Sequence, residues 1–230
     1  MIATLTGWLL GLMLGMRHAL EPDHLTAVST LVAENRDSRR GVLLGACWGL
    51  GHTLALLAVG LLLAALHTRM PGRIGALFEL GVALMLIVLG IRSVARGLRE
   101  GAAGTEHHHA HGGSSHVHAG PLHHVHVKRW TFARRSLLIG LVHGLAGSGA
   151  LTAFVLAEMP TLTGRLVYIA LFGIGSMMGM AMLSGLVGWP VAKLARRPGV
   201  ARAFLLTAGT VSAVLGFFRA APVVRILFQS

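Results

Sequence analysis

The chain has 230 residues, of which 54% are hydrophobic and only 12% are charged, whereas a soluble domain carries about 25% charged residues. This composition excludes an ordinary water-soluble globule and predicts a membrane protein. The net charge of +12 would suggest a nucleic-acid partner in a soluble protein, but here it is typical of the basic flanks of membrane helices. The single cysteine excludes a disulfide framework and any site of several thiolates.

Six stretches are long and apolar enough to cross a bilayer, which takes about 20 mostly apolar residues. Strands are not expected in them, because an open sheet edge cannot be left in hydrocarbon and the alternating pattern of a barrel is absent. The sequence therefore predicts an all-α membrane protein with six transmembrane helices. The predicted spans are 1–33, 41–66, 74–95, 136–157, 166–192 and 203–228.

The first span contains a cluster of ionisable residues, which must face protein or water because they are costly in lipid. These residues are Arg17, His18, Glu21, Asp23 and His24. Pro22 removes a backbone donor and disfavours helical angles at the residue before it. We therefore expect a broken first helix that ends near His18 and restarts at Pro22.

The break would aim His18, Asp23 and His24 at one point, whereas an unbroken helix would spread them around its axis. Imidazole nitrogen with carboxylate oxygen suits Ni(II), Co(II), Cu(II) or Zn(II). The alternative is that Glu21 and Asp23 only complement the N-terminal dipole of the restarted helix while His18 pairs with them.

Two further histidines are candidates for the ion pathway. His52 follows Gly49 and Gly51, small residues that let helices approach closely, and His143 lies next to Gly144. At His52 the alternative is a buried histidine that merely donates a hydrogen bond to a carbonyl.

The segment between the third and fourth spans is rich in histidine, glycine and serine. It has no packed core available, so we expect it to be mobile without a ligand. Its imidazoles are predicted to bind divalent late transition metals, with an affinity that falls as they protonate near about pH 6.5. An inert linker is the alternative. The histidines are His107, His108, His109, His111, His116, His118, His123, His124 and His126.

The distribution of basic residues predicts the orientation. Thirteen of them fall on one side of the predicted membrane and five on the other, so the positive-inside rule puts the larger set in the cytoplasm. Both termini are then expected outside and the loop 96–135 inside. The thirteen are Arg36, Arg39, Arg40, Arg96, Arg99, Lys128, Arg129, Arg134, Arg135, Lys193, Arg196, Arg197 and Arg202; the five are Arg69, Arg73, Arg165, Arg219 and Arg225.

The loop divides the chain into a first three-helix repeat, 1–95, and a second, 136–230, with weak internal similarity. Because each half has an odd number of spans, the second would cross in the opposite direction, as in the 3+3 inverted repeats of secondary transporters. Chance similarity among Gly/Leu/Ala-rich helices is the alternative. The matched segments are Gly15–His18 with Gly140–His143, Trp48–Gly51 with Phe172–Gly175, and Leu89-Gly90 with Leu215-Gly216.

The pattern His18-x4-Asp23-His24, followed by Leu50-Gly51-His52-Thr53, resembles the nickel/cobalt transporter family (NiCoT) and its shorter six-helix relatives. These relatives include urease- and hydrogenase-linked nickel permeases and nickel/cobalt efflux proteins. The resemblance implies that His18, Asp23 and His24 bind metal and that His52 contributes to the pathway or its selectivity. The second half departs from the longer transporters, because the segment 143–149 carries no carboxylate where they have an Asp/Thr/Glu-containing motif.

We therefore expect a secondary transporter of Ni²⁺, with Co²⁺ as a second substrate, in the cytoplasmic membrane. It would be no enzyme, have no resident cofactor and bind no nucleic acid. Uptake is favoured, since a divalent cation gains about 4.6 kcal/mol per 100 mV on entering a negative-inside cell. Nickel/cobalt efflux is one alternative. A membrane metal sensor or accessory subunit of a larger importer is another, and a metallochaperone or metalloenzyme-maturation protein is a possible partner of the histidine-rich loop.

Overall fold

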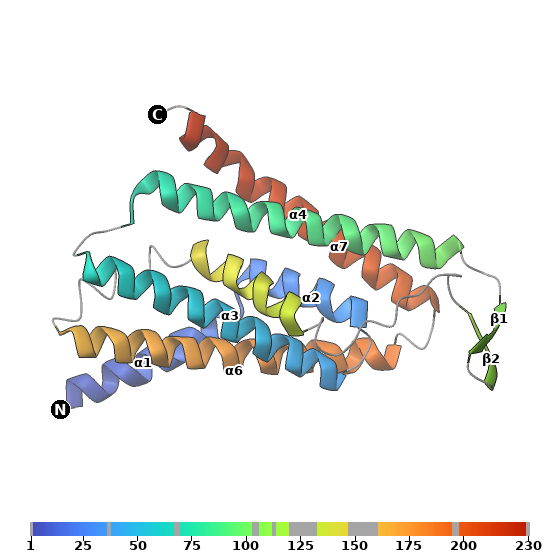
Figure 1. Ribbon diagram of the computed structural model, residues 1–230, viewed down its shortest axis with the longest axis horizontal. Helices are drawn as coiled ribbons and strands as arrows, with labels where there is room; N and C mark the ends of the chain where they lie inside the picture. The colour runs from blue at the N-terminus through green and yellow to red at the C-terminus, as the bar shows by residue number, and fades with distance from the viewer. Residues whose placement is uncertain are drawn as a thin grey trace.

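The protein is a bundle of long helices with one small hairpin at its end (Figure 1). The structure is a computed structural model that describes residues 2–35, 38–66, 70–102, 106–111, 114–119, 133–146, 161–194 and 198–228. Its helices are α1 (Ile2–His18), α2 (Pro22–Asn35), α3 (Ser38–Ala65), α4 (Gly72–Ala102), an unlabelled helix over residues 133–146, α6 (Leu162–Leu194) and α7 (Pro198–Phe228); its strands are β1 (Glu106–His111) and β2 (Ser114–Ala119).

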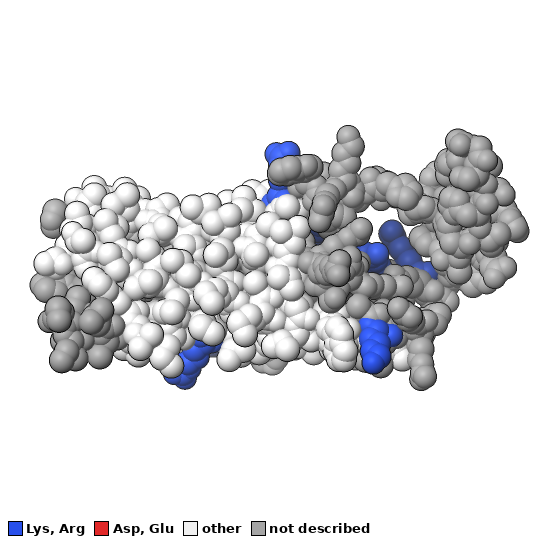
Figure 2. Space-filling model, turned by 90° about the horizontal axis from the view of Figure 1, so that it is seen from below, with Lys and Arg blue, Asp and Glu red and all other residues white. Residues whose placement is uncertain are grey.

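The outer surface of the bundle is apolar and the interior holds polar side chains, as expected in lipid. Leu62, Leu186 and Phe218 are more than half exposed, whereas Asp23, His24 and His52 are buried. Figure 2 shows one face that is almost free of Lys and Arg along most of its length, with most of the visible basic side chains toward the end where the hairpin lies. The protein is therefore a multi-pass membrane protein.

Four of the described helices are each long and apolar enough to span a bilayer, namely α3, α4, α6 and α7. Helix α1 has 17 residues and α2 has 14, so neither spans alone, but they follow one another along the long axis of the bundle (Figure 1). The N-terminus and the C-terminus lie toward the end opposite the hairpin.

The predicted break in the first helix is confirmed. Helix α1 ends at His18 with two short-range hydrogen bonds, from the Leu20 amide to the Arg17 carbonyl and from the Glu21 amide to the His18 carbonyl. Helix α2 starts at Pro22, where the missing N–H costs nothing because the first amides of a helix have no intrahelical partner.

Glycines let helices of the two halves touch backbone to backbone. A Cβ atom on Gly15 of α1 would overlap the carbonyl oxygen of Phe172 on α6, and one on Gly140 would overlap the carbonyl oxygen of Trp48 on α3. These two contacts join the positions that the sequence comparison matched, each crossing to the other half. Helix α1 thus packs on α6, and the helix over 133–146 packs on α3.

Helices α4 and α7 contact each other with the same kind of reciprocity. The hydroxyl of Ser93 donates to the carbonyl of Leu205 over 2.9 Å, and the hydroxyl of Ser212 donates to the carbonyl of Leu86 over 2.9 Å. Gly90 lies against Gly209 at the crossing point. The sequence comparison matched Gly90 with Gly216, whereas in the structure Gly216 lies against Ala83 and Ile87.

The central segment also differs from the sequence expectation. Helix α4 runs to Ala102, and the next helix starts at 133, so both extend into the predicted loop 96–135. The loop itself contains strands β1 and β2, paired antiparallel with His109 opposite His116. We predicted no regular structure there, and the pairing of β1 with β2 is the difference.

Replacing Gly15 with alanine should lower the thermal stability of the purified protein in detergent. The added methyl group collides with the rigid backbone of α6, and overpacking of this kind costs about 1–3 kcal/mol. Gly199→Ala is the matched control, since nothing lies within 4 Å of its Cβ position and alanine is the better helix former. Equal melting temperatures for the two variants would contradict the described packing.

Candidate metal centre

The helix break gathers five predicted site residues in the interior. His18 ends α1, Asp23 and His24 form the first turn of α2, His52 lies in α3, and His143 lies in the helix over 133–146. His18 is partly buried and the other four are buried. The structure thus brings together all the candidate residues that the sequence analysis placed within the membrane spans.

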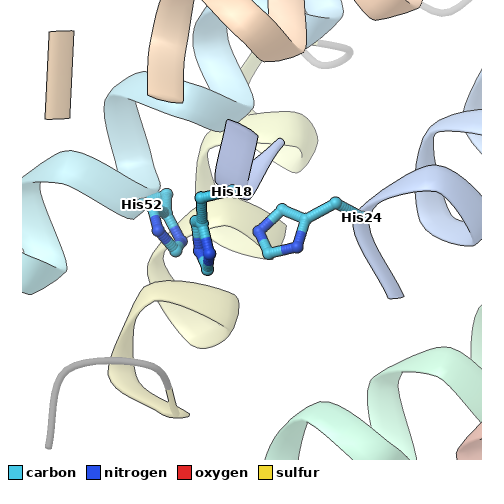
Figure 3. Close-up of side chains that lie close together, drawn as sticks. All are labelled: His18, His24 and His52. Atoms are coloured by element: carbon cyan, nitrogen blue, oxygen red, sulfur yellow. The ribbon is translucent and has the colours of Figure 1, made fainter. Parts of the chain in front are cut away.

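Three imidazoles converge at the centre of this cluster (Figure 3). The ring centroids of His18 and His24 lie 4.5 Å apart, those of His18 and His52 lie 5.1 Å apart, and those of His24 and His52 lie 5.4 Å apart. One nitrogen from each ring lies within 4.8 Å of the other two. A single ion can therefore be reached by all three after small rotations.

A second group overlaps the first at His24. Asp23, His24 and His143 each offer a ligand atom within 4.8 Å of the others, and the rings of His24 and His143 lie 4.1 Å apart. Asp23 is the most heavily bonded member. Its Oδ1 accepts the His24 amide at 3.0 Å and contacts His24 Nδ1 at 3.1 Å, while its Oδ2 contacts His143 Nε2 at 3.2 Å.

Several ring nitrogens in this cluster have no hydrogen-bond partner among the described residues. These atoms are His24 Nε2, His52 Nδ1, His52 Nε2 and His143 Nδ1. A buried polar atom normally has a partner, because leaving it unpaired costs about 1–3 kcal/mol. A metal ion bound through one nitrogen of each ring would remove part of that cost, and the alternative of histidines that only donate to carbonyls does not account for His52.

The alternative interpretation of the first span, in which its acidic residues pair locally with His18, is partly supported as well. His18 Nδ1 and Glu21 Oε1 lie 2.8 Å apart, the pairing expected if the acidic residues only balance local charge. That pair engages one nitrogen of His18 and leaves Asp23 with the buried group. The two roles therefore coexist in different residues of the same break.

Two cavities meet at His18 and Glu21. A small one of about 160 Å³ is lined by the five site residues together with Glu21, Glu79, Ala146 and Arg219. A larger one of about 580 Å³ lies beside Leu14, Tyr168 and Phe172 and shares His18 and Glu21 with the small one. His18 and Glu21 therefore stand between an open vestibule and the buried donor atoms.

The charge of the small cavity matches a divalent cation. With neutral imidazoles, its lining residues hold three carboxylates and one guanidinium, a formal charge of −2. Nitrogen and carboxylate donors without thiolates favour Ni(II), Co(II), Cu(II) and Zn(II) over Mg(II) or Ca(II).

The sequence analysis missed three residues of this site. Arg219, which it counted among the basic residues of the outer side, places Nη1 3.0 Å from Asp23 Oδ2. Trp48 stacks on His24 with ring centroids 5.5 Å apart and an interplanar angle of 16°. Glu79 of α4 lines the small cavity. An unpaired charge within an apolar helix was the available signal for Arg219 and Glu79, while nothing in the sequence distinguished Trp48.

Other predicted ligands are not settled by the geometry. The backbone of strands β1 and β2 includes His107, His108, His109, His111, His116 and His118. His123, His124 and His126 lie outside the described residues, as do Gly147, Ser148 and Gly149 after His143.

Comparison with known proteins identifies one matching family and two informative relatives. The family model NicO, described as "High-affinity nickel-transport protein", matches residues 5–218. "Urease accessory protein UreH" of Bacillus sp. (strain TB-90) is 32% identical over 207 residues, which cover 90% of this chain and 87% of the relative. "High-affinity nickel transport protein" of Cupriavidus necator is 33% identical over 69 residues, covering 30% of this chain and 20% of that protein. No solved structure matches the chain.

Proposed function

The chain belongs to the NicO family of high-affinity nickel-transport proteins, a family of transporters and not of enzymes, and from this premise we propose that it carries Ni²⁺ across the cytoplasmic membrane through the buried histidine cluster. The observation that carries the proposal is the overlap of two three-ligand groups at His24, inside an apolar bundle. Buried imidazoles and a carboxylate are costly in a membrane and are retained where they have a function.

We assign two roles to the five candidate ligand residues. His18, Asp23 and His24 replace the water shell of the ion, and His52 and His143 extend the path on either side of His24. Co²⁺ is a second substrate, because the same nitrogen and oxygen donors suit both ions.

Alternating access is proposed to arise from two inverted halves, 1–95 and 136–230, joined by the segment 96–135. The reciprocal contacts of Gly15 and Gly140 and the exchanged bonds of Ser93 and Ser212 support this arrangement. His143 of the second half contacts Asp23 of the first, so rocking of one half against the other would open the cavity to each side in turn.

Uptake is the proposed direction, with both termini outside and the hairpin in the cytoplasm. The excess of basic residues near the hairpin end supports this orientation. Radioactive nickel accumulation in cells without transporters of their own tests the direction. Cells that express the protein should hold more metal than empty-vector cells, and cells that hold less would establish the rival function of efflux.

The histidine tract is proposed to bind metal on the cytoplasmic side and to offer it to a maturation protein. Cross-strand pairing of His107 with His118 and of His109 with His116 brings four histidines into register on neighbouring strands. Replacing all the histidines between 107 and 126 by serine should lower the number of Ni²⁺ ions bound per protein at pH 7.5, with nickel flux within about threefold of wild type, since the ligands at the helix break are unchanged. Equilibrium dialysis and transport measured on one preparation check this, and unchanged stoichiometry would refute it.

A second candidate function is suggested by the name of the relative UreH, a urease accessory protein. In that case the chain would be a subunit that needs other proteins for transport. Reconstitution of the purified chain alone distinguishes the two functions, because an accessory subunit gives no flux by itself.

A further inference from the structure

Arg219 is the basic side chain that reaches the metal centre from α7. Its Nη1 atom lies 3.0 Å from Asp23 Oδ2, and the side chain of Asp23 is only 4% exposed while that of Arg219 is 41% exposed. The same carboxylate oxygen also contacts His143 Nε2 at 3.2 Å. The centre therefore contains a cation that is paired with its most buried carboxylate.

A metal ion that binds Asp23 through Oδ2 would compete with this cation for that oxygen. A guanidinium has five donors and no acceptor and remains charged at every physiological pH, so it cannot act as a ligand. A divalent ion bound to Asp23, His24 and His143 would stand within a few ångströms of it and repel it. Binding of the ion through Asp23 Oδ2 thus requires Arg219 to leave.

The surrounding residues give the displaced side chain a place to move. Glu79 on α4 lines the same small cavity as Arg219 and is exposed. The partial exposure of Arg219 shows that it stands at the rim of the site and does not need to cross the packed core. A shift from Asp23 toward Glu79 keeps the guanidinium near a carboxylate in both states.

We propose that Arg219 is the internal counter-cation of the empty carrier: it neutralises Asp23 when no metal is bound, gives way to Ni²⁺, and returns to Asp23 after release. The proposal rests on the transport function above and adds a step to it. An unpaired Asp23 would make the empty carrier costly to reorient inside the bilayer, since a buried charge without a partner is strongly destabilising. Arg219 is therefore needed for the return of the empty carrier and not for movement of the loaded one.

Two transport modes separate these steps in liposomes that contain the purified protein. Net uptake of radioactive nickel into metal-free vesicles needs the empty carrier to return, whereas exchange against internal unlabelled nickel does not. In Arg219→Gln we expect net uptake to fall at least about tenfold while exchange stays within about threefold of wild type. The substitution removes the partner of Asp23 in the empty carrier, and only net uptake needs the empty carrier to reorient. Arg219→Lys should recover much of the net uptake.

Equilibrium binding of Ni²⁺ to the detergent-solubilised variants provides the second readout. Arg219→Gln should bind the ion at least as tightly as wild type, because the competitor is gone. Arg225→Gln, an exposed arginine further along the same helix, is the matched control and should behave as wild type in all assays. Wild-type net uptake in Arg219→Gln would overturn the proposal, as would a joint loss of binding and exchange, which would make Arg219 a residue that only holds the site together. A wild-type protein that moves no nickel in either mode would instead refute the transport function itself.

Discussion

Replacing His24 with alanine should abolish nickel transport. His24 is the one residue shared by both ligand groups, its Nε2 has no partner among the described residues, and its ring lies 4.1 Å from His143 and 4.5 Å from His18. Loss of a supporting residue around a metal typically lowers affinity by about 10–100-fold, so loss of a shared ligand should exceed that range. Radioactive nickel uptake in cells and equilibrium binding to purified protein measure the effect.

The control for this variant is Leu86→Ala. Leu86 is fully buried and packs in the same core cluster around Trp48, so its truncation leaves a cavity without removing a donor atom. A stability loss of about 2–5 kcal/mol is expected there, with nickel affinity close to wild type. If His24→Ala kept wild-type uptake, the ligand assignment would be wrong.

Replacing Asp23 with asparagine should weaken nickel binding by about 100-fold or more, because it removes one full charge from a buried site while keeping the side-chain volume. The carboxylate contacts His24, His143 and Arg219. The asparagine side chain cannot balance the guanidinium, so the variant should also be less stable in detergent. Isothermal titration with Ni²⁺ and thermal unfolding measure the two effects separately.

Glu79→Gln provides the comparison for Asp23→Asn. Both carboxylates line the small cavity, but Glu79 is exposed whereas Asp23 is buried. Glu79 is less enclosed by the other site residues than Asp23, so its loss should lower affinity by less than about fivefold. A larger effect from Glu79 than from Asp23 would place the ion at the rim and contradict a site at the helix break.

Local chemistry made the helix break predictable. Pro22 fixes the backbone at its own position and disfavours a helix at Glu21, whatever the rest of the chain does. The end of α1 at His18 and the start of α2 at Pro22 follow from these constraints alone. The grouping of His18, Asp23 and His24 was predictable for the same reason, since all three lie within one turn of the break.

Contacts between distant segments were less predictable. Arg219 was interpreted as a marker of the outer side, because counting basic residues does not tell which way α7 turns each side chain. The stacking of Trp48 on His24 depends on how α2 and α3 pack on each other. Trp48 also lies against Gly140 of the helix over 133–146, through its backbone carbonyl. Two glycine-rich helices can pack in several registers that the sequence alone does not distinguish. In the structure Gly90 of α4 lies against Gly209 of α7.

Reconstitution of the purified chain in liposomes that contain a nickel-sensitive dye tests the central claim most directly. With an inside-negative potential and Ni²⁺ outside, the wild-type protein should produce an influx that disappears in His24→Ala and persists in Leu86→Ala. Protein-free liposomes define the background leak. An influx no greater than that leak under every gradient and potential would contradict transport by this chain and leave the accessory function.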